Sequence, residues 1–468
     1  MQISKYSEPE FSPYDDTQQT KDHEPGPWPA PAASKALRAS LTLPGSKSLT
    51  NRELVLAALA DGPSTLRTPL RSRDSALMIE ALRSLGTEIA ETGSGQYGPD
   101  LRITPTELVG GTSIDCGLAG TVMRFLPPVA ALALGPVSFD GDAGARRRPM
   151  RTTISSLRAL GVDVSDDGRG SLPFSLYGTG QVLGGELEID ASASSQFVSG
   201  LLLAAARFTN GLNLRHAGAS LPSQPHIDMT IAALRARGVV VHTPEPGHWI
   251  VEPGPIAGID VTIEPDLSNA APFLISAIVA GGTVKITGWP DATTQVGAHL
   301  EHLLPLWGVT VSRVDGALVV DGGAGVVGGV KLPGVVLDLS LGGELAPALV
   351  ALAALASGPS RITGIGHLRG HETDRLAALA ANINLLGGAV TELDDGLRIE
   401  PRPLVGGPWR AWEDHRMAHA GAILGLAVPG ILIDDIAATG KTMPEFAGLW
   451  ARTVGAAPAA GRDPILMF

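Results

Sequence analysis

The sequence repeats one structural unit six times, and this repetition limits the possible folds more than any other feature. Each copy runs through a Gly turn, a strand of β-branched residues, a polar loop, a helical stretch of Ala and Leu, a second Gly and another strand. The copies cover residues 61–89, 134–164, 210–241, 281–311, 357–390 and, in truncated form, 429–455. Their leading glycines recur roughly every 70 to 76 residues, a period that indicates a βα supersecondary unit longer than a solenoid repeat.

The helical stretch of each copy has apolar residues at i, i+3 and i+4 spacing, as Ile154, Leu157 and Leu160 illustrate. The Gly that follows it can adopt the left-handed conformation in which many helices end. Six such units predict an α/β protein in which three units form each of two similar domains. The alternative is one large mixed sheet in which the copies resemble one another by chance.

We expect the chain to cross between the two domains twice, near residues 43–47 and again near residues 263–266. One domain is then discontinuous and contains residues 35–46 and 265–468. The other domain contains residues 47–264. Three repeated units fall on each side of this division.

The bulk composition narrows the classes of function. The chain has 468 residues, of which 44% are hydrophobic, and a formal net charge of −12, so its average surface repels nucleic acid and anionic membranes. Its one cysteine, Cys116, excludes an internal disulfide framework and favours the cytoplasm. Residues 1–34 lack apolar periodicity and predict a disordered tail without a signal peptide. The longest apolar runs, such as residues 345–356, fall short of the roughly 18 residues of a membrane span, so we expect a soluble protein.

Basic residues gather in the polar loops that precede the helices, where helix N-termini also present free N–H groups to anions. They are Lys47, Arg52, Arg73, Arg124, Arg146, Arg147, Arg148, Arg369, Arg375, Arg416 and Lys441. A single Arg in such a loop is usually a solvated charge, but recurrence in an acidic protein favours a shared site for a polyanion. The loop "GSKS" (45–48) is typical of a phosphate-binding turn before a helix that we expect to begin near Asn51. The segment "ASSQF" (193–197) is consistent either with phosphate or polyol binding or with an ordinary helix N-cap.

Three segments imitate well-known motifs. "GSGQYG" (93–98) matches a dinucleotide fingerprint, but Pro99 and Asp100 follow where a helix must begin, so we expect a hairpin turn. "DIAATGKT" (435–442) imitates a nucleotide-binding loop without its first Gly and retains only the capacity to bind phosphate. His415 and His419 have the spacing of zinc ligands, but neither the Glu of the zincin motif nor a third ligand accompanies them. We therefore expect neither a metal nor a cofactor.

Seven ordered motifs resemble those of the enolpyruvyl transferases, and most closely those of the members that join phosphoenolpyruvate to shikimate 3-phosphate. The motifs are "LPGSKSLTNR", "AGTVMR", "RRRPM", "SSQF", "HETDRL", "DHRMAH" and "TGKT", and they span residues 41 to about 455. The resemblance implies two domains of three βαβαββ units each, an inside-out α/β barrel, with the active site in the cleft between the domains and with domain closure around the substrates. It also implies a cytoplasmic enzyme that acts on these two small molecules.

The resemblance assigns residues to both substrates. Those for shikimate 3-phosphate are Lys47, Ser48, Arg52, Ser194, Ser195, Gln196, Ser223, Glu344 and His371. Those for phosphoenolpyruvate are Lys47, Gly120, Arg124, Arg148, Arg375, Arg416 and Lys441. Two phosphates and two carboxylates carry up to about six negative charges, and converging Lys and Arg side chains can bind them.

The same resemblance assigns catalytic roles to Glu344, Glu372 and Lys47. The acceptor hydroxyl attacks C2 of phosphoenolpyruvate while C3 is protonated, and the tetrahedral intermediate then expels phosphate. Glu372 is expected to protonate C3, and Glu344, where an Asp is more common, to act as the base. Because Glu372 and Arg375 are three residues apart, a helix starting at this point would place them on one face. His371 stands where the family usually has a Lys.

Two other functions fit parts of the pattern. The UDP-N-acetylglucosamine enolpyruvyl transferases share the fold, but they carry a reactive Cys in the loop that here reads "GDAGARRRP", which contains none. A non-catalytic anion-binding protein would keep the basic cluster, yet it would gain nothing from Glu344 and Glu372 in its pocket. We expect a monomer that binds neither nucleic acid nor membrane.

Overall fold

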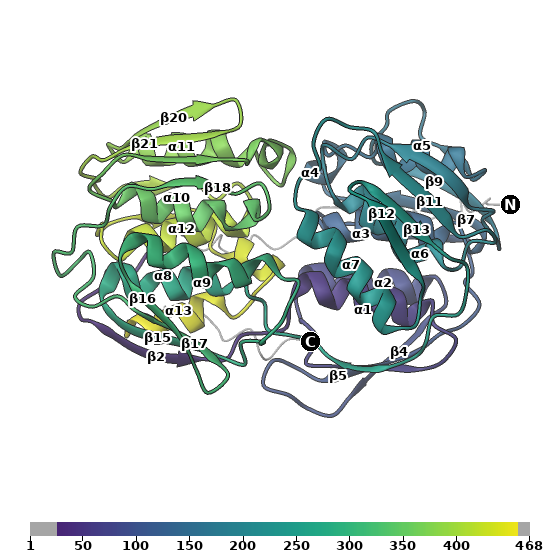
Figure 1. The fold of residues 1–468 in the computed structure, drawn as a ribbon, viewed down its shortest axis with the longest axis horizontal. Helices are drawn as coiled ribbons and strands as arrows, with labels where there is room; N and C mark the ends of the chain where they lie inside the picture. Colours follow the sequence, from purple (N-terminus) through teal and green to yellow (C-terminus); the bar gives the residue numbers. More distant parts are fainter. Residues whose placement is uncertain (1–25, 457–468) are drawn as a thin grey trace, which may run out of the picture.

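The computed structural model describes residues 26–456 and consists of two halves of similar size, which lie side by side in Figure 1. Buried hydrophobic residues form one cluster in each half. The first cluster combines residues 30–43 with residues 267–454, and the second draws on residues 54–263. We call the halves the first and the second half in this order.

The βαβαββ unit is best seen in the middle of the second half. Its elements are β6 (Thr112–Asp115), α3 (Gly120–Ala130), β7 (Leu134–Asp140), the short α4 (Ala143–Arg146), α5 (Arg151–Ala159), β8 (Asp163–Ser165) and β9 (Phe174–Thr179). The sheet has the order β6-β7-β9-β8, in which β6 and β7 are parallel and β9 is antiparallel to both of its neighbours. Each helix therefore connects two strands or leads into the closing hairpin.

The second half contains two further units of this kind. One consists of β10 (Gly185–Ile189), α6 (Gln196–Ala205), β11 (Leu212–His216), α7 (Gln224–Ala236), β12 (Val241–Glu245) and β13 (His248–Val251). The other consists of β14 (Asp260–Thr262), α1 (Lys47–Ala58), β3 (Ser64–Arg67), α2 (Arg73–Ser84), β4 (Glu88–Thr92) and β5 (Asp100–Thr104). Their sheets have the orders β10-β11-β13-β12 and β14-β3-β5-β4.

The first half repeats the arrangement. One unit has β2 (Leu37–Leu41), α8 (Ala270–Ala280), β15 (Gly282–Thr287), α9 (Leu300–Leu303) between the 3-10 turns η1 (Val296–His299) and η2 (Leu304–Trp307), β16 (Thr310–Val314) and β17 (Ala317–Asp321). The next has β18 (Val336–Asp338), η3 (Gly343–Leu345), α10 (Ala346–Ala354), β19 (Ser360–Thr363), η4 (Gly366–Gly370), α11 (Arg375–Leu385), β20 (Ala389–Leu393) and β21 (Gly396–Glu400). The truncated unit has β22 (Pro408–Trp409), α12 (His415–Gly425), β23 (Leu432–Ile433), η5 (Ala437–Lys441) and α13 (Phe446–Val454), with β1 (Trp28–Pro29) as its third strand.

Helices occupy the interior of each half, and the small sheets lie outside them. Every residue of α3 and of α8 is buried, as expected for helices that are apolar on all sides. The six sheets are separate, so the alternative of one large mixed sheet is wrong. The glycines that follow the second helix of each unit have positive φ angles between 68° and 104°, which confirms the predicted left-handed helix ends; they are Gly86, Gly161, Gly238, Gly308, Gly387 and Gly455.

The chain crosses between the halves at two adjacent places. β2 pairs with β15 of the first half, but the next helix, α1, packs in the second half. Conversely, β14 pairs with β3 of the second half, and the chain then enters α8 of the first half. Gly45 and Pro265 form a bridge between the two crossing segments, where the Ser46 amide donates to the Glu264 carbonyl at 2.8 Å.

The expected disordered tail is wrong for its last part. Residues 1–25 lie outside the described residues, as do residues 457–468. β1, however, pairs with β23, and the amide of Ala30 donates to the carbonyl of Ile431 at 3.0 Å. Ala30 is buried and Trp28 packs on the same core. The segment is too short to show a periodic pattern of apolar residues in the sequence. None of the helices in residues 26–456 is long and apolar enough to cross a membrane.

Candidate active site

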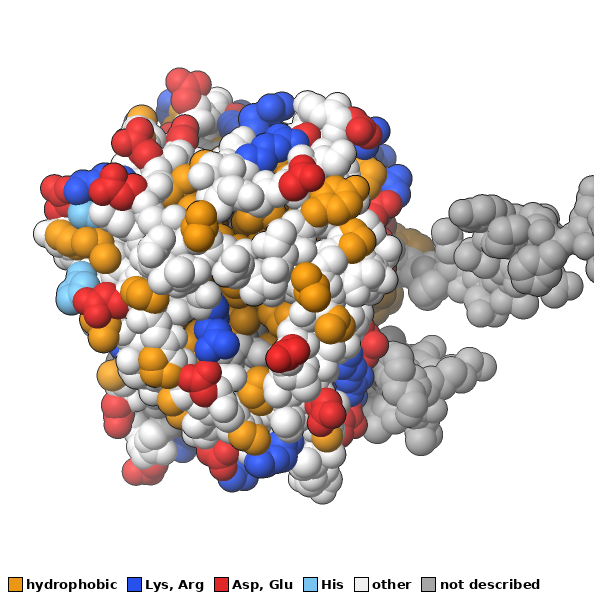
Figure 2. All heavy atoms as spheres, turned by 90° about the vertical axis from the view of Figure 1, so that its right-hand side faces the viewer, with side chains coloured by type: hydrophobic (Ala, Val, Ile, Leu, Met, Phe, Trp, Pro, Cys, Tyr) orange, Lys and Arg blue, Asp and Glu red, His pale blue; other side chains and the backbone are white. Residues whose placement is uncertain are grey.

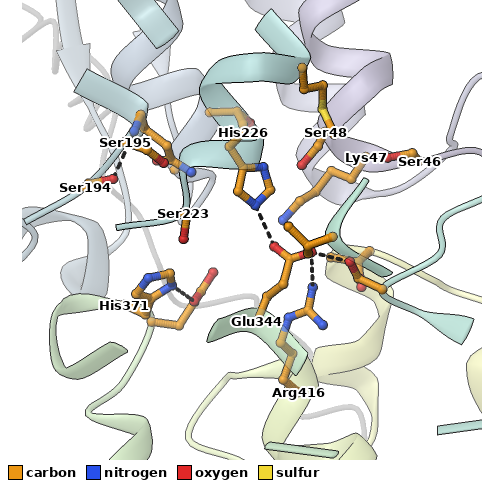
Figure 3. Close-up of a pocket in the computed structure, with 18 of the residues that line it drawn as sticks. Ser46, Lys47, Ser48, Ser194, Ser195, Ser223, His226, Glu344, His371 and Arg416 are labelled. Atoms are coloured by element: carbon orange, nitrogen blue, oxygen red, sulfur yellow. Dashed lines mark hydrogen bonds and ion pairs between the residues drawn. The ribbon is translucent and has the colours of Figure 1, made fainter. Parts of the chain in front are cut away.

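A cavity lies between the two halves and brings together most of the residues assigned from the sequence. Those that line it are Lys47, Ser48, Arg52, Gly120, Arg148, Ser194, Ser195, Gln196, Ser223, Glu344, His371, Glu372, Arg375 and Arg416. Figure 3 shows side chains from both halves facing one another across it. Of the assigned residues, Arg124 and Lys441 are not part of the lining.

The first turn of α1 supplies one wall of the cavity. The helix begins at Lys47, with Ser46 as its N-cap, so the expected start near Asn51 is wrong by one turn. Lys47 and Ser48 consequently stand at the helix N-terminus, where unpaired amides favour anions. Lys47 also forms an ion pair with Asp74 of α2 at 3.3 Å.

Arg52 lines the same wall, but its donors are largely used within the protein. It donates to the Ser48 carbonyl at 2.8 Å, to the Thr230 hydroxyl at 2.8 Å and to the His226 carbonyl at 2.9 Å. Burial lowers the pKa of Arg52 to about 9, against the attraction of Glu344 and Glu53. The guanidinium therefore stays protonated at neutral pH and orders α1 and α7 around the cavity.

Hydroxyl groups reach the cavity from the starts of α6 and α7. Ser195 occupies the N-cap position of α6, yet its side chain makes no capping hydrogen bond, which leaves the hydroxyl free for another partner. Ser194 Oγ accepts from the amide of Gln196 at 3.2 Å. Ser223 adopts a left-handed conformation with φ of 55°, a strained geometry that often occurs at functional sites.

An acidic and basic cluster from the first half forms the opposite wall. Arg375 donates to Glu372 at 2.9 Å and to Asp414, the N-cap of α12, at 2.7 Å. Lys441 of η5 contacts the other oxygen of Glu372 at 2.5 Å. The expectation that Glu372 and Arg375 share a helical face is wrong, because α11 begins at Arg375 and Glu372 precedes its N-cap, Asp374. The two side chains still meet.

This cluster keeps Glu372 ionised. Burial alone would raise the pKa of Glu372, but Lys441, Arg375, Arg148 and His371 outweigh burial and hold the pKa well below its ordinary range. A carboxylate paired with two cations cannot donate a proton. Any role of Glu372 as an acid therefore requires that these cations find other anionic partners.

Cations of both halves converge on one backbone oxygen. Lys441 from the first half and Arg148 from the second both donate to the carbonyl of Leu118 at 3.2 Å. Gly120 lies close by, and a Cβ there would be 3.0 Å from the guanidinium of Arg148. Arg124 lies behind this wall and donates to the carbonyl of Pro149 at 3.1 Å.

Glu344 forms a second centre where the halves meet (Figure 3). One oxygen of its carboxylate lies 2.8 Å from Nε2 of His226. The other accepts a short hydrogen bond from Ser268 and is 3.9 Å from Arg416. Burial would raise the pKa of Glu344, but His226, Arg416 and the Ser268 hydroxyl hold it well below its ordinary range, so the group is a carboxylate.

Two histidines of the site, His371 and His367, are neutral. Burial and Arg375 lower the pKa of His371 well below its ordinary value, and they lower the pKa of His367 to about 4. His415 lines the cavity and neither of its ring nitrogens has a hydrogen-bond partner within the described protein, whereas His419 packs against Phe446 in the core. Among residues 26–456 no group of three or more His, Cys, Asp or Glu side chains could hold a metal ion.

Several basic residues of the predicted cluster are used elsewhere. Arg73 pairs with Asp142 at 2.6 Å, Arg146 with Asp140 at 2.6 Å, and Arg369 with Asp374 at 3.0 Å, all on the surface. Figure 2 shows acidic and basic side chains interspersed over the outer face of the second half. The expectation that all basic loops face one site is therefore wrong for these three arginines.

Four partners of the site residues escaped the sequence reasoning: His226, Ser268, Asp74 and Asp414. Asp74 and Asp414 belong to segments singled out for their arginines, "RSRD" and "DHRMAH", but their acidic members were not considered. A signal existed in both segments, because a buried Lys or Arg needs a carboxylate partner. No local signal marks His226 or Ser268, since each acts on a residue far away in the chain.

Of the three look-alike motifs, the first has the structure expected of it. Residues 93–98 form the hairpin turn between β4 and β5, closed by hydrogen bonds between Gly95 and Gly98. Residues 437–441 form η5, which places Lys441 against Glu372. Cys116 is buried, which raises the pKa of its thiol to about 12 and prevents it from acting as a thiolate nucleophile.

Comparisons with known proteins agree with this geometry. Residues 31–450 match the family model described as EPSP synthase (3-phosphoshikimate 1-carboxyvinyltransferase). A 3-phosphoshikimate 1-carboxyvinyltransferase of Kocuria rhizophila is 56% identical over 435 residues, which cover 92% of this chain and 96% of that protein.

Solved structures resemble the fold as well. The EPSP synthase of Acinetobacter baumannii has a TM-score of 0.74 at 26% identity and covers 90% of this chain and 97% of its own. The enolpyruvyl transferase NikO of Streptomyces tendae has a TM-score of 0.69 at 17% identity, with 90% of this chain and 96% of its own covered, and supports the fold alone.

Proposed function

The chain belongs to the EPSP synthase family, and on this basis we propose how its residues divide the reaction between them. It is a transferase that moves the enolpyruvyl group of phosphoenolpyruvate to the 5-hydroxyl of shikimate 3-phosphate and releases phosphate, a step of the shikimate pathway. The observation that carries the assignment of roles is that two carboxylates, Glu344 and Glu372, lie among cations of both halves at one cavity.

Shikimate 3-phosphate is proposed to bind on the side of the second half. The hydroxyls of Ser194, Ser195 and Ser223 and the start of α1 offer donors to its phosphate. Phosphoenolpyruvate is proposed to bind between Arg148, Arg375, Arg416 and Lys441, together with Gly120. The remaining assignments are those given from the sequence. The shikimate 3-phosphate site also includes Lys47, Ser48, Arg52, Gln196, Glu344 and His371. The phosphoenolpyruvate site also includes Lys47 and Arg124.

The addition step is proposed to use both carboxylates. The oxygen of the 5-hydroxyl forms a bond to C2 of phosphoenolpyruvate, and Glu344 accepts the proton that this hydroxyl loses. The electron pair of the C2–C3 double bond takes a proton from Glu372, which gives a methyl group at C3. Lys47, at the start of α1, neutralises charge that develops on the intermediate.

Glu372 must take up a proton from the solvent when the substrates bind. Lys441 and Arg375 hold it ionised through contacts of 2.5 Å and 2.9 Å. When the phosphate and carboxylate of phosphoenolpyruvate attract these cations, their hold on Glu372 weakens and its pKa rises toward the range of a general acid. The acid therefore becomes competent only when the substrate is in place.

The elimination step reverses the proton transfer at C3. Glu372, now a carboxylate, removes a proton from the methyl group, the C2–C3 double bond forms again, and the bond between C2 and the phosphate oxygen breaks. Arg148 and Lys441, which share the Leu118 carbonyl, stabilise the departing phosphate.

A phosphate-release assay tests the function. We expect the purified protein to release inorganic phosphate from phosphoenolpyruvate only when shikimate 3-phosphate is present. Binding of both ligands without phosphate release would instead indicate a non-catalytic anion-binding protein. Release with UDP-N-acetylglucosamine would indicate the cell-wall transferase, which the absence of a Cys from residues 141–149 argues against.

We further propose two domains that close on the substrates: residues 35–46 with 265–468, to which β1 and Ala30 also belong, and residues 47–264. The two hydrophobic clusters and the crossing segments support this division. The net charge of −12 and the single cysteine support a place in the cytoplasm without nucleic acid or membrane partners. A monomer is proposed because a cleft that must open and close gives no sequence evidence of a partner surface. Neither a metal nor a cofactor has a part in the proposed mechanism.

A further inference from the structure

His226 connects the two halves at the carboxylate that we propose as the base. It lies in the first turn of α7 in the second half, and its Nε2 is 2.8 Å from Oε2 of Glu344, which belongs to η3 of the first half. Figure 3 shows the imidazole and the carboxylate directed toward each other across the cavity. A carboxylate has no hydrogen to give, so the hydrogen of this bond is on Nε2 of the imidazole.

The backbone of His226 is fixed by bonds that do not involve Glu344. Its carbonyl accepts from Arg52 at 2.9 Å and from the hydroxyl of Thr230 at 3.1 Å. The preceding turn is held by Ser223, whose amide donates to the carbonyl of Ser340 in the other half at 3.2 Å. The imidazole therefore presents its donor from a rigid support.

The carboxylate, by contrast, depends on its partners for its orientation. Ser268 donates to one oxygen and His226 to the other, while Arg416 is 3.9 Å away. Each carboxylate oxygen has two lone pairs, so each keeps one that is free for the acceptor hydroxyl. Without His226 the remaining partners, Ser268 and Arg416, both act on one oxygen, and the other oxygen loses the contact that fixes its position.

We propose that His226 is a positioning residue for Glu344, which it holds in the orientation needed to take the proton of the acceptor hydroxyl. This inference rests on the proposed role of Glu344 as the base. Because donor and acceptor come from different halves, the base is correctly oriented only when the halves are in contact. Turnover is thereby coupled to the closed arrangement of the protein.

The pH dependence of turnover gives the inference its sharpest test. The attraction of His226 is among the effects that keep the pKa of Glu344 low, so its loss raises that pKa. The other charged or titratable groups that act on Glu344 or His226 are Arg52 of α1, Asp266, His367 of η4, Arg375 of α11 and Arg416 of α12. All of them remain in a His226 variant. The acid limb of the kcat profile should therefore move to higher pH, and this shift can be assigned to the loss of His226.

The experiment compares His226→Ala, His226→Gln and the control His242→Gln in steady-state kinetics over a range of pH. His242 forms a similar pair with Glu252 at 2.8 Å, but on the surface and far from the cavity lining. A lost hydrogen bond to a charged group costs about ten- to a hundredfold in rate. We expect His226→Ala to lose this much in kcat and to shift the acid limb of the kcat profile. His226→Gln should recover part of the lost kcat and reverse part of the shift, because its amide donates from a similar place. The control should match the wild type.

Two results would overturn the inference. One is a rise in KM with unchanged kcat and pH profile in His226→Ala, which indicates a contact that only joins the halves. The other is an equal loss in the Ala and Gln variants. A Glu344→Gln variant separates this inference from the proposed function. If Glu344→Gln retains full turnover, the role of Glu344 as the base fails. If Glu344→Gln is inactive but His226→Ala is unaffected, only the role of His226 is refuted.

Discussion

Replacing Glu372 by Gln isolates proton transfer from binding. The side chain keeps its size, and Arg375 stays in place because Asp414 holds it at 2.7 Å. Lys441 can still contact an amide oxygen and keeps its bond to the Leu118 carbonyl. The variant thus loses a negative charge and the capacity to give and take a proton, but little of its structure.

The expected size of the effect follows from these contacts. General acid–base catalysis contributes about 10²- to 10⁴-fold in rate, and we expect kcat to fall by this amount. The KM for phosphoenolpyruvate should stay the same or decrease, because the carboxylate that competes with the substrate for Lys441 and Arg375 is gone. Removal of a binding residue would have the opposite effect on KM.

Steady-state release of phosphate, with each substrate varied in turn, measures both constants. Glu392→Gln is a matched control, because Glu392 is also paired with an arginine, Arg369 at 2.7 Å, but lies on the surface of β20. A kcat of Glu372→Gln within about threefold of the wild type, far below the range for acid–base catalysis, would refute the role of Glu372. A large rise in KM with little change in kcat would reassign Glu372 to substrate binding.

Further predictions concern the cavity and the core. Gly120→Ala should raise the KM values for both substrates, because the new Cβ would lie 3.0 Å from Arg148 and 3.0 Å from Gln196; unchanged constants would contradict this. Arg237→Met should lower the free energy of unfolding by about 3–5 kcal/mol, because it leaves the buried carboxylate of Glu53 without its partner at 2.7 Å. Unfolding in urea measures this loss. A change near zero would show that Glu53 is protonated in the variant. Burial lowers the pKa of His419 to about 3, so the unfolded chain binds more protons than the folded protein below the unfolded histidine value of about 6.5. As the pH falls from about 6.5 towards about 3, stability should therefore decrease by about 1.4 kcal/mol per pH unit for this one group. A His419→Leu variant with the same slope would contradict this.

The repeated unit could be predicted from the sequence because its signals are local. Alternation of strands and helices and the glycines after helices, such as Gly161 with φ of 86°, depend on neighbours in the chain. Element boundaries were less certain. α1 begins one turn before the expected start because Ser46 caps it, and β1 gives no periodic signal because only two of its residues pair.

The contacts within the site could not be predicted from the residues alone. Whether a basic loop faces the cavity or the solvent depends on partners remote in the chain, as the surface pair of Arg146 with Asp140 and the buried pair of Arg375 with Asp414 show. The pair of His226 and Glu344 joins residues that are 118 positions apart and lie in different halves. The resemblance to the family supplied the identities of the site residues, and the structure supplied their partners.

The two crossing segments also determine how the chain can be divided. β2 is an edge strand of the sheet β16-β17-β15-β2, although the chain continues from it into the second half. Truncation before α1 would uncover the open edge of β15, which invites pairing with other chains and aggregation. Cutting after β14 would leave a C-terminal fragment that starts at residue 263 and has the same bare edge, because β2 stays on the other piece. The C-terminal fragment should therefore need a segment that carries β2 in order to fold without aggregation.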